Sequence, residues 1–246
     1  MTGPQPIENE ARTLELILSP PHPCGYLPDL VANTLYIHPD FPMEMVRFEY
    51  LLATGFRRSG NLVYRPWCSG CDACVPVRIR VRDFAKSASL RRVIRRNRDL
   101  TVQSGRPVFS DEHFALYRRY INSRHGDGPM AEPEYAEFME FLYSDWCPVR
   151  FADFRLQGRL IMTAVYDLTR SSLSAVYTFF DPCEQARSPG TLAILWEIEL
   201  AQQLALDWVY LGYWIADCPK MRYKARFQPL EAYVNRRWIP LPTDAE

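Results

Sequence analysis

The sequence predicts an α/β protein of the α+β kind, built on a mixed sheet with helices on its faces. Residues 149–156, 159–166 and 174–180 alternate like an antiparallel meander, and a helical stretch at 191–206 leads into an apolar strand at 208–215. Of the 246 residues, 48% are hydrophobic and 24% charged, ordinary values for a globular chain with a core. We expect two domains, 1–105 and 106–246.

The first domain is expected to begin with a short strand at 14–18 that ends at Ser19-Pro20-Pro21. A helix follows from Pro42 and stops at Gly55, and residues 56–66 form a hairpin around Ser59-Gly60-Asn61. Residues 75–81 alternate apolar side chains with arginines, which predicts a strand with its arginines in a row on one surface.

Three helices are expected before the meander. Ser87 can cap the first, Ser110 can cap a second that runs to Arg124, and Pro133 opens a third that continues through Tyr143. The segment 181–190, between the meander and the long helix, reads as a loop.

Positive charge is concentrated in one window although the chain is neutral overall, with 29 basic and 29 acidic residues. Residues 78–98 carry nine basic side chains against the single acid Asp83, a net charge of +8. Arg91/Arg95 and Arg92/Arg96 repel each other at i,i+4 on a helix, so this arrangement indicates an anionic partner.

The seven cysteines argue against a disulfide framework, because we expect a cytosolic protein. The stretch before Cys24 lacks the layout of a signal peptide, and no run of eighteen apolar residues could span a membrane. Cys68, Cys71 and Cys74 follow one another at spacings of three, and Cys24 lies upstream. This spacing predicts a metal site at these four cysteines, either an iron–sulfur cluster or zinc.

Several motifs together resemble the aminoacyl-tRNA–protein transferase family, from about Leu14 to Trp238. The motifs are Cys24-Gly25-Tyr26-Leu27-Pro28, Gly55-Phe56-Arg57-Arg58-Ser59-Gly60, Tyr64-Arg65-Pro66 with the cysteine run, the segment 87–97, Tyr177-x-Phe179-x-Asp181-Pro182, Gly212-Tyr213-Trp214-Ile215, Lys220-Met221-x-Tyr223-Lys224 and Phe227-x-Pro229-Leu230-Glu231.

The resemblance implies an acetyltransferase-like C-terminal domain and transfer of an amino acid from its tRNA to proteins with N-terminal Asp or Glu, which marks them for degradation. Leucine from leucyl-tRNA is the expected donor, with arginine from arginyl-tRNA as the alternative. The chemistry is aminolysis of an activated ester, and no cofactor is required for transfer.

This reaction needs an anion track for tRNA, a cationic socket for the acceptor carboxylate and a means of handling a proton. For tRNA we expect Lys86, Arg91, Arg92, Arg95, Arg96, Arg98, Gly190, Lys220 and Lys224. For the carboxylate the candidates are Arg57, Arg58, Arg65, Arg78 and Arg80, because an arginine can grip a carboxylate with two hydrogen bonds. Catalytic candidates are Tyr177, Asp217 and Tyr223.

Two other functions remain open from the sequence. The segment Arg187-Ser-Pro-Gly190 partly matches the pyrophosphate loop of acyl-CoA-dependent acetyltransferases, although Leu192 occupies a small-residue position. A non-enzymatic RNA-binding regulator with a cysteine cluster would explain the basic window but not the C-terminal half. The sequence leaves the oligomeric state undetermined.

Overall fold

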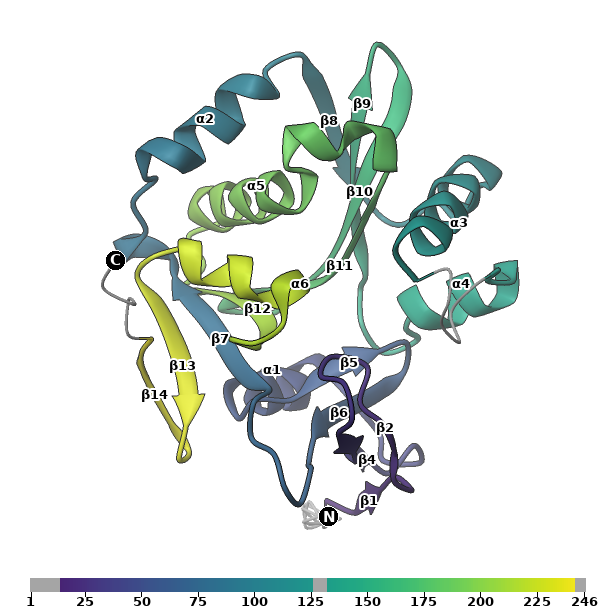
Figure 1. Cartoon of the computed structure of the whole chain (residues 1–246), viewed down its shortest axis with the longest axis vertical. Coiled ribbons are helices and arrows are strands. Elements are labelled where there is room, and N and C mark those ends of the chain that lie inside the picture. The colour runs from purple at the N-terminus through teal and green to yellow at the C-terminus, as the bar shows by residue number, and fades with distance from the viewer. Residues whose placement is uncertain (1–13, 126–131, 242–246) are drawn as a thin grey trace, which may run out of the picture.

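The structure is a computed structural model, and it describes residues 14–125 and 132–241. Two sheets dominate these residues, a smaller one near the N-terminus and a larger one that spans most of the chain (Figure 1). The mixed α/β class is confirmed. Of the helices in the described residues, none is long and apolar enough to cross a membrane. The expected domain ends, at residues 1 and 246, lie outside this description.

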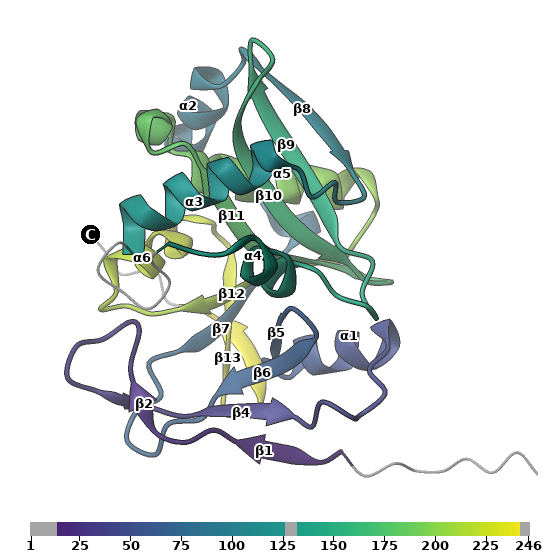
Figure 2. The same cartoon turned by 90° about the vertical axis from the view of Figure 1, so that its right-hand side faces the viewer.

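The smaller sheet has four strands and packs against one helix. Its order is β1 (Leu16–Leu18), β4 (Thr34–Ile37), β6 (Leu62–Pro66) and β5 (Arg57–Ser59), and the helix is α1 (Met45–Ala53). A short pair, β2 (His22–Pro23) and β3 (Val31–Ala32), lies beside it. The predicted first strand, helix and hairpin are confirmed. Figure 2 shows this sheet and α1 at one end of the molecule.

The larger sheet has eight strands. Their order is β14 (Arg237–Pro240), β13 (Leu230–Val234), β7 (Val75–Arg80), β12 (Trp208–Trp214), β11 (Ser172–Phe180), β10 (Arg159–Leu168), β9 (Arg150–Leu156) and β8 (Leu100–Gly105). Strands β9, β10 and β11 form the predicted antiparallel meander, and β11 pairs with β12 in parallel. The sequence did not predict the strands at its edges, β8, β13 and β14.

Helices cover both faces of the larger sheet (Figure 1). On one face lie α3 (Asp111–His125) and α4 (Tyr135–Leu142), where the Tyr117 ring packs edge-on against Phe179. On the other lie α2 (Ala88–Arg96) and α5 (Pro189–Gln203), where Trp196 packs against Phe154. Three short turns complete the fold: η1 (Val81–Asp83), η2 (Pro182–Arg187) and η3 (Tyr223–Arg226), the last preceded by α6 (Pro219–Arg222).

The larger sheet uses strands from both halves of the chain. Strand β7 pairs on one side with β12 and on the other with β13, and β8 pairs with β9. Val77 and Ile79 of β7 belong to the same core as Leu195 and Ile198 of α5. The boundary that the sequence suggests after residue 105 therefore falls inside the larger sheet and not between the two sheets.

Candidate functional site

The basic helix α2 presents its arginines to solvent. Ser87 caps it, because its Oγ accepts a hydrogen bond from the backbone N–H of Leu90 at 3.3 Å. Leu90 and Val93 are buried in the core, which fixes the opposite face outward. The exposed side chains are Arg91, Arg92, Arg95, Arg96 and, just beyond the helix, Arg98. Lys86 is half-buried and lies 3.6 Å from Glu199.

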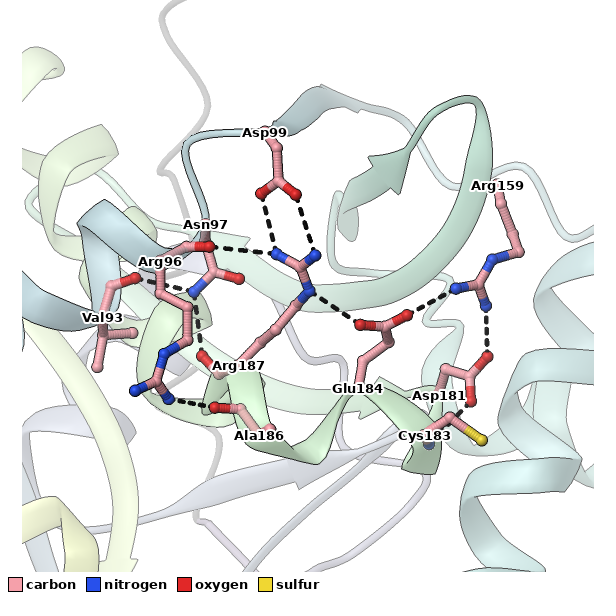
Figure 3. Close-up of polar contacts among 10 residues, drawn as sticks. All are labelled: Val93, Arg96, Asn97, Asp99, Arg159, Asp181, Cys183, Glu184, Ala186 and Arg187. Atoms are coloured by element: carbon pink, nitrogen blue, oxygen red, sulfur yellow. Dashed lines mark hydrogen bonds and ion pairs between the residues drawn. The ribbon is translucent and has the colours of Figure 1, made fainter.

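An ion-pair network joins the end of α2 to the turn η2 (Figure 3). The Arg187 guanidinium donates to both carboxylate oxygens of Asp99 at 2.9 and 3.0 Å, and to Glu184 at 2.9 Å. It also donates to the carbonyl of Arg96 at 3.2 Å. Arg187 is thus held by protein groups, unlike an arginine that awaits the pyrophosphate of an acyl-CoA.

Neighbouring contacts extend this network on both sides. Arg159 of β10 donates to Asp181 and to Glu184, each at 2.7 Å. The Asn97 amide donates to the carbonyl of Arg187 at 3.0 Å. We call the contacts of Arg187, Asp99, Glu184, Arg159 and Asn97 the η2 clamp. Because η2 leads directly into α5, the clamp fixes the start of α5 relative to the basic helix.

Strands β11 and β12 pair over a short distance and then diverge. Their parallel pairing runs from Ser172–Trp208 to Ser174–Tyr210. Beyond it, the Ala175 carbonyl of β11 accepts a hydrogen bond from Arg57, and the Tyr213 carbonyl of β12 accepts one from Lys224 Nζ at 2.6 Å. Cationic side chains from β5 and η3 therefore take the places that a paired strand would fill. We call this place the strand gap.

Both cations of the strand gap are buried. Burial, with the nearby Arg57 charge, lowers the pKa of Lys224 to about 7. Burial also lowers the pKa of Arg57. Lys224 is therefore placed inside the protein, not on the surface where a phosphate would meet it, whereas the other predicted lysine, Lys220, is exposed.

Glu197 of α5 lies near the strand gap without a partner. It is 1% exposed, and neither of its carboxylate oxygens has a hydrogen-bond partner within the described part of the chain. The Nη1 of Arg57 also has no hydrogen-bond partner within these residues. Burial raises the pKa of Glu197 to about 8, although the nearby Arg57 charge acts to lower it. Tyr223 is a further charge neighbour of Glu197, and burial raises the pKa of its hydroxyl.

The three predicted catalytic residues differ in their surroundings, although Tyr120 and Arg124 act electrostatically on both Tyr177 and Tyr223. Tyr177 packs against Phe141, Tyr120 and Tyr117 at ring distances of 5.0, 6.1 and 6.3 Å, and burial raises its pKa. Asp217 is exposed in the turn after β12. The Tyr223 hydroxyl faces the start of α5, where a Cβ on Gly190 would lie 3.8 Å from it.

Most of the predicted carboxylate-binding arginines already have internal partners. Arg58 donates twice to Asp167, at 2.6 Å each, and both side chains are fully buried. Arg78 and Arg80 pair with Glu231 at 2.8 and 3.3 Å, and Arg78 stacks 3.4 Å from the Trp208 ring centre. The arginines of β7 do share one surface, as predicted, but tryptophans and Glu231 cover it.

Arg65 of β6 differs from these, because the contacts described for its guanidinium are with aromatic rings. It lies 4.6 Å from the ring centre of Trp67 and 5.5 Å from that of Phe56. Its neighbours in the strand, Tyr64 and Pro66, line a pocket at the small sheet.

The four predicted cysteine ligands line this same pocket, which has a volume of about 210 Å³. Its other walls include Tyr26, Tyr64 and Tyr213. Burial and the neighbouring thiols raise the pKa of Cys74 to about 12. Within residues 14–125 and 132–241, however, no three His, Cys, Asp or Glu side chains are placed to hold a metal ion. The four thiols do not form a coordination shell in this structure, and the metal site stays a prediction.

Sequence reasoning missed Glu197, the η2 clamp and the tyrosines of the pocket. A signal for Glu197 was present: it lies four residues from both Ala193 and Ala201, on the helix face that is buried. A carboxylate at such a position indicates either a hidden partner or a ligand. The clamp pairs residues 88 positions apart, which no local pattern predicts.

Two family models and many named relatives match this chain in sequence. The family model described as "Arginine-tRNA-protein transferase, N terminus" matches residues 22–92, and its C-terminus counterpart matches residues 112–234. The aspartate/glutamate leucyltransferases of Pseudomonas fluorescens Pf-5 and Pseudomonas entomophila L48 are each 49% identical over 232 residues, 94% of this chain and 99% of theirs.

Similarity to solved structures is lower. FemX aligns with a TM-score of 0.45 and 9% identity, over 71% of this chain and 61% of its own. The C-terminal domain of a putative lysylphosphatidylglycerol synthetase from Agrobacterium fabrum aligns with a TM-score of 0.44 and 18% identity. The alignment covers 58% of this chain and 47% of that one. The two family models together match well over half of the chain, and on this ground it belongs to the arginine-tRNA-protein transferase family.

Proposed function

We propose that this protein is an aminoacyltransferase of the cytoplasm that moves leucine from leucyl-tRNA to the N-terminal Asp or Glu of acceptor proteins. The observation that carries the proposal is the similarity, over nearly the whole chain, to aspartate/glutamate leucyltransferases. The arginyl alternative has less support, because it rests on the name of the family model alone.

The reaction is aminolysis of an ester. The free α-amine of the acceptor attacks the carbonyl carbon that joins leucine to the tRNA ribose, and a tetrahedral oxyanion forms. The new C–N bond is completed when the C–O bond to the ribose breaks, and the amine proton passes to the departing ribose oxygen. The α-amine has an ordinary pKa of about 7.7–8.0, so a useful fraction is neutral near pH 7. Positioning can therefore supply much of the acceleration.

The basic helix α2 is the proposed tRNA surface. Five exposed arginines lie within and just after one short helix. Such a surface can bind the phosphates of a nucleic acid whatever its base sequence. The η2 clamp holds this surface next to the start of α5, where Gly190 and the helix amides suit a phosphate of the tRNA acceptor end. Tyr223, whose hydroxyl faces Gly190, is the proposed contact for the terminal nucleotide.

For the acceptor we propose the cysteine-lined pocket, with Arg65 as the carboxylate partner. Arg58, Arg78 and Arg80 are already paired to acids, whereas the guanidinium of Arg65 stacks on the rings of Trp67 and Phe56, and its charge acts on Tyr213 in the wall of the pocket. An Arg65→Ala variant should then raise the KM for an Asp peptide while tRNA binding stays unchanged. An unchanged peptide KM would remove Arg65 from this role.

Transfer can be tested with the purified protein, labelled leucyl-tRNA or arginyl-tRNA, and peptides that begin with Asp, Glu or Ala. The proposal predicts label on the Asp and Glu peptides from leucyl-tRNA. Transfer from arginyl-tRNA would keep the family and change the donor. No transfer from either, with the cysteines reduced, would favour the RNA-binding regulator.

A further inference from the structure

The strand gap leaves three buried polar atoms without hydrogen-bond partners in the described part of the chain. They are both carboxylate oxygens of Glu197 and the Nη1 of Arg57, and these side chains are 1% and 7% exposed. An unsatisfied buried polar group costs about 1–3 kcal/mol, and more when it is charged. Such a cost is retained where a ligand supplies the missing partners.

The chemistry of these atoms specifies what the ligand carries. Glu197 can only accept hydrogen bonds when ionised, so it needs a donor, best an ammonium group. Arg57 can only donate, so its free N–H needs an acceptor oxygen. The Arg57 charge acts on the Glu197 carboxyl, so one ligand that carries both an ammonium and an acceptor oxygen can meet both side chains. An α-amino ester has this arrangement, with its ammonium one carbon away from its carbonyl.

We propose that Glu197 and Arg57 bind the leucyl end of the charged tRNA: Glu197 holds the α-ammonium, and Arg57 donates to the ester carbonyl oxygen. This inference rests on the proposed function and assigns two residues to it. Arg57 then also stabilises the oxyanion that forms on this oxygen when the acceptor amine attacks. Glu197 takes no part in bond making and selects a donor with a free α-amine.

Helix geometry supports the donor over the acceptor at this place. Glu197 lies seven residues after Gly190, and at 1.5 Å per residue this is about 10 Å along α5. That is about the reach of a terminal nucleotide whose phosphate lies at the start of the helix. The cysteine-lined pocket, proposed for the acceptor, has Tyr64 and Tyr213 in its wall, and both are charge neighbours of Arg57. Arg57 thus lies between the two proposed substrates.

The electrostatics of the neighbours agree with an ammonium ligand. Lys224, the lysine of the strand gap, has a pKa lowered to about 7, so its repulsion of a second cation is reduced. Burial raises the pKa of Glu197 to about 8, and an ammonium bound beside it favours the ionised carboxylate again. The half-buried Tyr223 side chain lies at the start of α5, and the Glu197 charge acts on its hydroxyl, so Tyr223 lies on the side of Glu197 from which the terminal nucleotide is proposed to enter.

The test compares leucyl-tRNA with N-acetyl-leucyl-tRNA, which keeps the ester and loses the ammonium. The wild-type protein should prefer leucyl-tRNA by about tenfold or more in kcat/KM, the ratio that corresponds to about 1.4 kcal/mol. In Glu197→Gln, kcat/KM for leucyl-tRNA should fall until it is close to that for N-acetyl-leucyl-tRNA. The KM for the acceptor peptide should stay unchanged. Glu199→Gln, the same change on an exposed residue of α5, should keep the wild-type ratio.

A second measurement needs no variant. Leucine methyl ester should inhibit transfer by the wild-type protein, and methyl 4-methylpentanoate, the same ester without the amine, should not. Equal inhibition by both esters, or a Glu197→Gln protein that keeps the preference, would overturn the proposal. A raised KM for the acceptor peptide in Glu197→Gln would assign the gap to the acceptor instead. Absence of any transfer by the wild-type protein would refute the proposed function, a separate outcome.

Discussion

Glu197 and Lys224 show how strongly burial acts on single residues in this protein. Both are buried, and each shifts toward its neutral form: the pKa of Glu197 rises to about 8 and that of Lys224 falls to about 7. A globular interior does not keep such groups for stability, because an apolar residue would cost less. Their presence indicates function.

The Glu197 shift predicts how stability changes with pH. The folded protein keeps a proton on Glu197 up to about pH 8, whereas the unfolded chain releases it near the ordinary value of 4.5. The unfolded state therefore binds fewer protons in this window, and stability is lost as pH rises from about 4.5 to 8. Glu197→Gln removes this loss.

Urea unfolding at pH 5 and pH 8 measures the effect. Relative to the wild type, the free energy of unfolding of the variant should be a few kcal/mol more favourable at pH 8 than at pH 5, since each pKa unit is worth about 1.4 kcal/mol.

No gain at pH 8 would mean that Glu197 is solvated or paired in solution. Glu199→Gln serves as the control, since Glu199 is exposed on the same helix.

Thiol reactivity should follow burial among the seven cysteines, which are all free in the structure. Cys183 is exposed, whereas burial raises the pKa of Cys74 to about 12 and raises that of Cys147 too. Since the thiolate is the nucleophile, an alkylating reagent at pH 8 should modify Cys183 first and these two last. Mass mapping of a time course measures the order. Rapid modification of Cys74 would show that the pocket opens to solvent more than its burial indicates.

The sequence identifies the arginines, but it does not show which of them pair with acidic residues inside the protein. Arg58 pairs with a residue 109 positions away and Arg78 with one 153 positions away. His113 likewise reads as an unremarkable helix residue, yet its ring lies between Ser110 at 2.7 Å and Asp153 at 3.0 Å. These contacts are made by the tertiary fold, and no spacing along the chain encodes them.

At the scale of elements, local chemistry predicted α2 well. Its cap, its two buried apolar residues and its outward arginines all follow from the order of residues in one short segment. The edge strand β8, in contrast, is mostly exposed and polar, with no alternation to reveal it. It forms because β9 offers an unpaired edge, a condition that only the assembled sheet creates.

The exposed arginines of α2 predict a salt-dependent fall in tRNA affinity when their charge is reversed. Arg91→Glu with Arg95→Glu should weaken leucyl-tRNA binding and lower the slope of log affinity against log salt by about one for each phosphate that the helix no longer neutralises. Filter binding over a range of salt measures both effects. Arg237→Glu, a single charge reversal on the edge strand β14, is the control and is compared with Arg91→Glu alone. Equally weakened binding in both variants would place the tRNA elsewhere.

At the scale of the whole molecule, the two sheets are joined through buried and half-buried polar contacts. Arg58 of β5 pairs with Asp167 of β10, and Glu49 of α1 accepts from the backbone and hydroxyl of Ser171 at 2.8 and 2.6 Å. The strand gap also takes one cation from each side of this junction, Arg57 from the smaller sheet and Lys224 from the C-terminal segment. The site therefore exists only when both parts are docked.

Breaking the ion pair at this junction should lower the free energy of unfolding of the whole protein. Arg58→Ala leaves Asp167 charged and fully buried without its partner, which should cost about 3–5 kcal/mol. Urea unfolding should show this destabilisation in a single transition, because the sheets share the pair. The exposed Arg170→Ala should stay within about 0.5 kcal/mol of the wild type. Two separate transitions in the wild type would mean that the parts fold independently.

The most direct test of the account offers both donors at once. Equal amounts of leucyl-tRNA and arginyl-tRNA are mixed with the protein and a peptide that begins with Asp, and the product is identified by mass. We predict a peptide extended by leucine alone, together with no product from the same peptide after acetylation of its N-terminus. A peptide extended by arginine, or a peptide left unextended by an intact and reduced protein, would contradict the account.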